Sequence, residues 1–345
     1  MLLPTSELLF SDAMDLESGG RLEELEIAYE TWGELNETGD NAVLVCHGYT
    51  NNQHAAGEGG WFSGVIGPGR AVDTDRMFVV AANMLGSAYG STGPASIDPA
   101  SGAPYGLGFP DLTVGDMVKA QIRLLEYLGV RRLTAVIGNS YGGHLAFQWG
   151  TAHPEWVDRL VVVVSAIKGR GDSSTVDTLI NRFETCSGWN GGHYYADERG
   201  AGVFDEMIEL RKETLRNYGY ENKIRMDVGD DQDAIEAGLT ALAEPWAEQF
   251  DANSLIVLRK AAVRFDARPN VAQLQAPVLY VLSRTDNLFP PSIAPATMAL
   301  LADAGVEARY FEIDSDNGHR APSIDGHLWA EELRAFMTRP LPPAV

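Results

Sequence analysis

Five short apolar runs divide the chain and predict the strands of a sheet. They consist mainly of valine, leucine, isoleucine and alanine, and few polar residues interrupt them. Such runs are typical of strands that are buried on both faces of a parallel sheet. The runs cover residues 42–48, 77–85, 133–138, 160–166 and 277–283, and strand character also appears at 307–313.

Other segments show different periods. Residues 22–35 alternate apolar and polar side chains, which predicts a half-buried antiparallel strand near a sheet edge. Apolar residues at helical spacing predict a helix over 113–130, which begins after a capping threonine and ends near a glycine. Two more helices are expected, over 142–154 and 326–337.

The pattern changes between residues 167 and 267, where the chain becomes mostly helical and acidic. Strands and helices alternate before this segment and resume after it, as in an open, mostly parallel sheet with a helical insertion. We therefore expect one α/β core made of residues 1–166 and 268–345. Residues 167–267, here called the lid segment, are expected to be inserted into that core.

Charge and cysteine content narrow the function classes. The chain has 48 acidic and 26 basic residues, a net charge of −22, which argues against a nucleic acid or an anionic membrane as partner. Its two cysteines, Cys46 and Cys186, form neither a disulfide framework nor a metal motif. With no secretory signal and no long apolar stretch, the expectation is a cytoplasmic protein.

The stretch Gly138-Asn139-Ser140-Tyr141-Gly142 carries the candidate chemistry. It follows a predicted buried strand and opens a predicted helix, the context in which GxSxG presents a nucleophilic serine. The flanking glycines suit a strained turn that lifts the Ser140 hydroxyl above the sheet. A plain tight turn is the alternative, and a serine nucleophile also needs a base and an orienting acid.

Asp286 and His319 are the expected partners of Ser140. Each lies in a loop just past a predicted strand, and the chain order Ser, Asp, His is the one that this architecture uses. Asp314 and Asp316 are rival acids, but they lie too close to His319 in sequence to come from a separate strand end. Structural or surface roles are expected for the other histidines, which are His47, His54, His144, His153, His193 and His327.

Acyl transfer also requires donors for the developing oxyanion. We expect the backbone N–H of Tyr141, directly after the nucleophile, and the backbone N–H of Tyr49, in the loop after strand 42–48. The alternative for His47-Gly48 is a plain turn at the strand end. No dinucleotide, phosphate-loop or zinc motif is present, so no cofactor and no metal are expected.

Longer motifs resemble a known family. The stretch from "GWFSGVIGPGRAVDTDRMFVVAANMLGSAYGSTGPASIDP" to "LLEYLGV", together with "WNGGHYY" and "DNLFPP", is similar to the homoserine O-acetyltransferases and their ester-hydrolase relatives. The resemblance runs from about residue 22 to the end. It implies the α/β-hydrolase fold, with a mostly parallel sheet, helices on both faces and a helical lid over Ser140. It implies the same triad and suggests a homodimer formed through the lid.

The same resemblance assigns substrate-binding roles. In "ELRKETLRNYGY", Arg211 and Tyr218 have the spacing of the family's lid arginine and tyrosine, which meet the acceptor's carboxylate. An ordinary surface position for Arg211 is the alternative. Arg320 departs from the family, whose transferases usually carry an aspartate there to hold the acceptor's ammonium group. Tyr141 replaces a common methionine, and Gly48 replaces an alanine.

Together these departures favour a serine ester hydrolase for short-chain, acetyl-type esters as the first expectation. The expected partner is then a small-molecule ester. The second expectation is homoserine O-acetyltransferase, in which homoserine takes the place of water. A non-catalytic binding protein on the same fold is the third, and the intact order of the triad speaks against it.

Overall fold

A computed structural model describes residues 6–10, 12–196 and 202–341. Its core is an eight-stranded sheet in the order β1-β4-β8-β5-β9-β10-β11-β12, parallel from β8 to β12 and antiparallel at β1 and β4. The strands are β1 (Ser6–Phe10), β4 (Leu25–Trp32), β5 (Ala42–Cys46), β8 (Phe78–Ala82), β9 (Leu133–Asn139), β10 (Leu160–Val163), β11 (Val278–Ser283) and β12 (Ala308–Ile313). Two small pairs are β2 (Met14–Asp15) with β3 (Arg21–Leu22), and β6 (Ile66–Gly67) with β7 (Val72–Asp73).

Each predicted strand is present, and the central ones are buried on both faces. Along β5, Leu44 packs into the core on one side of the sheet, while Val43 and Val45 pack into the core on the other. The pleat explains this division, because successive side chains point to opposite faces. The predicted alternating strand is shorter than expected and ends at Gly33, whose φ of +80° suits a turn.

Two short elements were not predicted. The edge strand β1 pairs antiparallel with β4, and its five residues have too little length to stand out as a pattern. The β6–β7 pair has only two residues in each strand, too few to form a recognisable pattern. The last predicted helix is split, since a 3₁₀ turn at 326–328 precedes α10.

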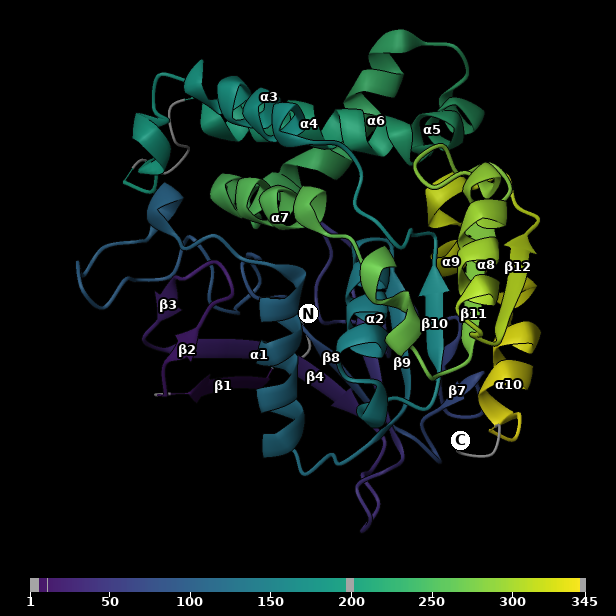
Figure 1. Cartoon of the computed structure of the whole chain (residues 1–345). Coiled ribbons are helices and arrows are strands. Elements are labelled where there is room, and N and C mark those ends of the chain that lie inside the picture. The colour runs from purple at the N-terminus through teal and green to yellow at the C-terminus, as the bar shows by residue number, and fades with distance from the viewer. Residues whose placement is uncertain (1–5, 11, 197–201, 342–345) are drawn as a thin grey trace.

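Helices cover both faces of the sheet (Figure 1). The expected helix over 113–130 is α1, which Thr113 caps by accepting a hydrogen bond from the Asp116 N–H. The helices outside the lid segment are α1 (Val114–Tyr127), α2 (Tyr141–Ala152), α8 (Ala294–Asp303), α9 (Ala321–Ile324) and α10 (Ala330–Thr338). Short 3₁₀ turns are η1 (Gly106–Gly108), η2 (Pro154–Trp156), η3 (Asn190–Gly192), η4 (Arg268–Gln273), η5 (Pro291–Ile293), η6 (Gly318–Arg320) and η7 (Gly326–Leu328).

The lid segment leaves the sheet after β10 and returns to it before β11. Its helices lie together above the carboxyl ends of the parallel strands, with α7 nearest the sheet (Figure 1). They are α3 (Ser173–Glu184), α4 (Val203–Asn217), α5 (Tyr220–Val228), α6 (Gln232–Ala247) and α7 (Ala252–Arg264). None of the helices in the described ranges has the length and apolar character needed to cross a membrane.

Candidate active site

Ser140 occupies a strained turn between β9 and α2. Its φ of 55° and ψ of −117° lie outside the regions that L-residues normally adopt. The turn ends the strand and starts the helix within one residue, so the side chain stands at the carboxyl edge of the sheet. The sequence predicted this strand–turn–helix context, and the structure confirms it.

Close backbone contacts explain the glycines around Ser140. A Cβ at Gly138 would lie 2.0 Å from the carbonyl oxygen of Gly142, and a Cβ at Gly142 would lie 2.0 Å from that of Cys46. At Gly143 the nearest atom would be the Ser165 Cβ, at 2.3 Å. Backbone cannot move aside cheaply, so α2 approaches β5 and β9 this closely only because side chains are missing there.

Ser140, His319 and Asp286 form one hydrogen-bonded chain. The Ser140 Oγ lies 2.8 Å from Nε2 of His319, and Nδ1 of His319 lies 2.8 Å from Oδ2 of Asp286. The other carboxylate oxygen, Oδ1, accepts the backbone N–H groups of Leu288 at 2.8 Å and Phe289 at 3.2 Å. These two bonds orient the Asp286 carboxylate toward the imidazole. All three side chains of the chain are buried.

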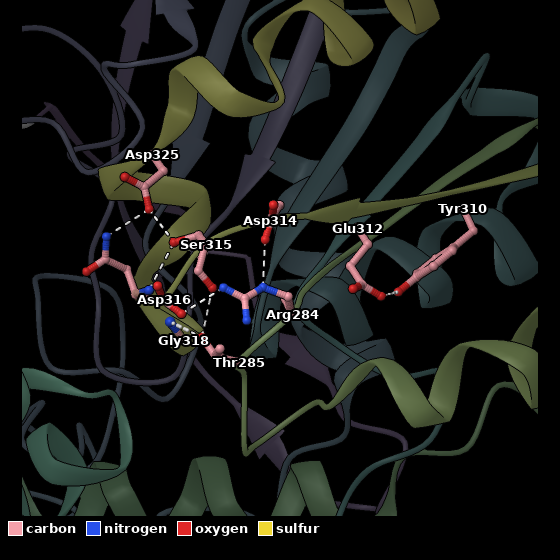
Figure 2. A network of polar contacts seen from close by, with 10 residues as sticks. Arg284, Thr285, Tyr310, Glu312, Asp314, Ser315, Asp316, Gly318 and Asp325 are labelled. Carbon is pink, nitrogen blue, oxygen red and sulfur yellow. Dashed lines mark hydrogen bonds and ion pairs between the residues drawn. The ribbon is translucent and has the colours of Figure 1, made fainter.

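The loop that carries His319 is tied to the loop that carries Asp286. The Thr285 hydroxyl donates to the carbonyl of Ser315 at 2.9 Å and accepts the N–H of Gly318 at 3.1 Å (Figure 2). From the other side, Asp325 accepts the Ser315 hydroxyl at 2.5 Å and the Asn317 amide at 2.8 Å. Hydrogen bonds from Thr285 and from Asp325 therefore fix the loop that carries the His319 imidazole.

The rival acids lie on the surface. Asp314 and Asp316 form ion pairs with Arg284 at 2.6 and 2.7 Å (Figure 2). The carboxylate that His319 contacts is that of Asp286. Among the other histidines, His47 and His144 are buried, and burial lowers the pKa of each to about 4. His47 accepts the Met84 N–H at 3.0 Å, as a neutral structural histidine would.

The two expected oxyanion donors flank Ser140. In the described part of the chain, the backbone N–H groups of Tyr49 and Tyr141 have no acceptor, and both residues border the space in front of the serine. Their rings stack at 5.9 Å with an interplanar angle of 7°. Their hydroxyls donate to α7, that of Tyr49 to the Leu255 carbonyl at 2.5 Å and that of Tyr141 to the Leu258 carbonyl at 3.0 Å.

Two cavities meet at Ser140, one on each side. The first, about 350 Å³, is mainly apolar and lies between α2, α7 and the loop of Leu288 and Phe289; His144, Arg170 and Arg259 also border it. The second, about 430 Å³, lies between η6 and the lid helices α4 and α5. We call them the acyl cavity and the acceptor cavity, after the roles proposed for them below.

Arg211, Tyr218 and Arg320 all border the acceptor cavity. The Tyr218 ring packs against the imidazole of His319, with ring centres 4.9 Å apart. Arg211 lies on the lid helix α4, is half-buried and borders the cavity, so it is not an ordinary surface arginine. Burial lowers its pKa from the ordinary value, although nearby tyrosines oppose this change. The Arg320 side chain also lies at this cavity, a point that the sequence left open.

Several residues of the site escaped the sequence analysis. Arg259 lies over the ring of Tyr49 at 4.9 Å, and Arg170 lies over the ring of Phe289 at 5.5 Å. Tyr220 stacks on Arg320, and Thr50 bonds Arg211. No local signal marks these residues, because each contact joins residues that are a hundred or more positions apart. No group of three metal-ligating side chains occurs within the described ranges.

Comparisons with known proteins identify the family of the chain. A family model for the alpha/beta hydrolase fold matches residues 41–322. Curated homoserine O-acetyltransferases are similar over nearly the whole chain: that of Moorella thermoacetica is 36% identical over 95% of this chain and 94% of its own, and that of Symbiobacterium thermophilum is 37% identical over 93% and 91%.

Solved structures show the same likeness. The crystal structure of a homoserine O-acetyltransferase from Bacillus anthracis has a TM-score of 0.88 and 26% identity, over 99% of this chain and 100% of that one. The crystal structure of esterase E22 has a TM-score of 0.85 and 25% identity, over 97% and 100%. Transferases and esterases thus share this fold and this chain length.

Proposed function

Since the chain belongs to the alpha/beta hydrolase family, and within it to the homoserine O-acetyltransferases and their relatives, we propose that it is an O-acetyltransferase. It moves an acetyl group from a thioester to the hydroxyl of a small, carboxylate-bearing acceptor. The ester hydrolase, the first expectation from sequence, therefore becomes the second candidate, because the curated relatives are transferases. Membership of this enzyme superfamily also removes the non-catalytic binding protein from consideration.

In the first half-reaction, the Ser140 hydroxyl attacks the carbonyl carbon of the acetyl thioester. His319 takes the hydroxyl proton at Nε2, which lies 2.8 Å from Oγ, and then gives it to the leaving thiolate. The Oγ–acetyl bond forms and the thioester bond breaks. Asp286 accepts the Nδ1–H of the imidazole, which fixes the tautomer and stabilises the positive charge that develops on the ring.

In the second half-reaction, the acceptor hydroxyl attacks the acetyl-enzyme. Its proton passes to Nε2 of His319 and from there to the Ser140 Oγ as the Oγ–acetyl bond breaks. The acceptor leaves as its acetyl ester. In both steps the N–H groups of Tyr49 and Tyr141 stabilise the tetrahedral oxyanion, the role for which their free donors suit them.

The acceptor's carboxylate is assigned to Arg211 and Tyr218 in the acceptor cavity. The half-buried guanidinium of Arg211, which has no carboxylate partner among the described residues, offers a strong site for such a group. Binding there brings the acceptor to the face of Ser140 that His319 serves. The observation that carries the proposal is the hydrogen-bonded chain Ser140–His319–Asp286 between two separate cavities.

The test is acetyl transfer from acetyl-CoA. The purified protein should form an acetyl-enzyme that mass spectrometry detects as a covalent acetyl group on Ser140, with release of one equivalent of CoA. When an acceptor such as L-homoserine or 4-hydroxybutyrate is added, CoA release should continue over many turnovers. Ser140→Ala should abolish both signals. Acetyl-CoA that stays intact with every hydroxy-carboxylate tried, together with rapid turnover of p-nitrophenyl acetate, would refute a transferase.

That second result defines the other candidate, a serine ester hydrolase. Arg320 is the observation that favours it, because a cation at the acceptor cavity disfavours an acceptor that carries an ammonium group. In a hydrolase, water replaces the acceptor and His319 removes its proton. Turnover of p-nitrophenyl acetate that L-homoserine and 4-hydroxybutyrate leave unchanged would identify this activity.

A further inference from the structure

Among the described residues, the walls of the acceptor cavity include two arginines and no carboxylate. Arg211 reaches it from α4, and Arg320 reaches it from η6, directly after His319. Elsewhere in the described chain, arginines commonly pair with acids, as Arg182 and Arg216 do with glutamates of the lid segment. Neither arginine of the cavity has such a partner in the parts of the chain that the structure describes.

Arg320 is held in place but not neutralised. Only 8% of the residue is exposed. Its Nε donates to the carbonyl of Tyr218 at 3.2 Å, its Nη2 donates to the Asn317 amide oxygen at 3.3 Å, and its guanidinium lies 3.9 Å from the ring centre of Tyr220. The third nitrogen, Nη1, is buried without an acceptor. Neutral oxygens and an aromatic ring fix this side chain and leave its charge uncompensated.

Arg211 is in the same condition. Its Nη1 donates to the Thr50 hydroxyl at 2.9 Å, and its guanidinium lies 4.9 Å from the Trp246 ring. Its Nε is buried without an acceptor. The groups that act on its charge are tyrosines, not carboxylates.

Two cations without acidic partners in one cavity, Arg320 buried and Arg211 half-buried, determine what can bind there. A buried charge is unfavourable unless an opposite charge and hydrogen bonds compensate it. No acidic side chain of the described residues pairs with either guanidinium group, although the net charge of the chain is −22. A ligand with two anionic groups would satisfy both guanidinium groups, whereas an ammonium group next to Arg320 would be repelled.

We propose that the acyl acceptor of this protein is a hydroxydicarboxylic acid, with one carboxylate at Arg211 and the second at Arg320, and not an amino acid. The inference rests on the proposed acetyl transfer and specifies its acceptor. The reaction is the one given above: the acceptor hydroxyl displaces Ser140 from the acetyl group, and the product is the O-acetyl ester of the diacid.

Three acceptors that share the same hydroxyl arm test the proposal. They are 4-hydroxybutyrate, L-homoserine and 2-(2-hydroxyethyl)malonate, which carry hydrogen, ammonium and carboxylate, respectively, at the carbon next to the common carboxylate. With acetyl-CoA as donor, kcat/KM should be highest for the malonate and lowest for L-homoserine. The malonate should exceed 4-hydroxybutyrate by about tenfold or more, as expected of an added charge-assisted hydrogen bond. A higher kcat/KM for L-homoserine than for the malonate would overturn the proposal.

Arg320→Asp should invert the preference between the malonate and L-homoserine, and Arg320→Gln should remove it. The ratio of the two kcat/KM values is the readout, because a general loss of activity cancels in it. Arg225→Asp is the matched control, since Arg225 lies on α5 of the lid segment and pairs with Glu221 on the surface. It should leave the ratio unchanged. An unchanged ratio in a folded Arg320→Asp protein would refute the role of Arg320.

Binding to Ser140→Ala separates this inference from the proposed function. Titration calorimetry should show tighter binding of 2-(2-hydroxyethyl)malonate than of L-homoserine, whether or not the wild-type protein transfers acetyl groups. Tighter binding of L-homoserine would refute the diacid site even if the transferase activity is demonstrated. Absence of an acetyl-enzyme, with the malonate still the tighter ligand, would refute only the proposed acetyl transfer.

Discussion

The backbone at Ser140 predicts an unusual order of stability between two inactive variants. Ser140→Ala and Ser140→Gly both remove the hydroxyl that faces His319, so the loss of that hydrogen bond cancels in the comparison. They differ only in the Cβ. At φ 55° and ψ −117° a Cβ is strained by about 1–3 kcal/mol. Glycine relieves this strain but adds freedom to the unfolded chain, which offsets about 0.4–1 kcal/mol.

Ser140→Gly should therefore be more stable than Ser140→Ala by about 1–2 kcal/mol. For 345 residues this corresponds to a rise in Tm of about 1.5–3 °C. Scanning calorimetry or urea unfolding of the two proteins measures the difference. Ala152→Gly, at the exposed end of α2, is the control and should lower stability by about 0.5–1 kcal/mol. If Ser140→Gly is the less stable of the pair, the turn holds no strain.

Three further predictions concern the triad, acid stability and salt. Asp286→Asn should lower kcat for p-nitrophenyl acetate about 10³–10⁴-fold with the fold intact, because the imidazole loses its orienting acceptor; a loss below tenfold would contradict this role. The pKa values of His47 and His144 are about 4 in the folded protein, against an ordinary value of 6.5. Below pH 6.5 the unfolded chain therefore binds more protons than the folded protein. The free energy of unfolding should fall from pH 6.5 to about pH 4, by about 3 kcal/mol for each histidine. His144→Gln should make the urea midpoint less dependent on pH in this window, and an unchanged slope would exclude a contribution from His144. With a net charge of −22, repulsion within the protein should decrease as salt screens it, so Tm should rise between 0.1 and 1 M NaCl; a flat or falling Tm would contradict this.

Local patterns determined much of what the sequence could predict. The buried strands are visible because a strand covered on both faces must be apolar at nearly every position. The turn at Ser140 is visible because close backbone approach admits only glycine at Gly138 and Gly142. The common location of Asp286 and His319 could be predicted because parallel strands bring their carboxyl ends to one edge of the sheet.

What the sequence could not predict depends on distant contacts. The direction of the Arg320 side chain depends on the Tyr218 carbonyl and the Tyr220 ring, which belong to a segment a hundred residues earlier. The walls of the acyl cavity depend on where α7 comes to rest above the sheet. Neither the periodicity nor the composition of the sequence around Arg170 and Arg259 indicates that these two residues meet near the serine.

The hydroxyls of Tyr49 and Tyr141 hold helix α7 at two carbonyls, Leu255 and Leu258, that are nearly one turn apart. Two hydrogen bonds spaced in this way fix both the position of the helix along its axis and its rotation about that axis. A slip of one residue would carry both carbonyls about 1.5 Å away and turn them by about a quarter of a circle. Helix α7 therefore determines where Tyr49 and Tyr141 lie on either side of the serine. Neighbouring loops can accommodate insertions before this helix. An insertion between Leu255 and Leu258 would instead move one carbonyl away from its tyrosine hydroxyl.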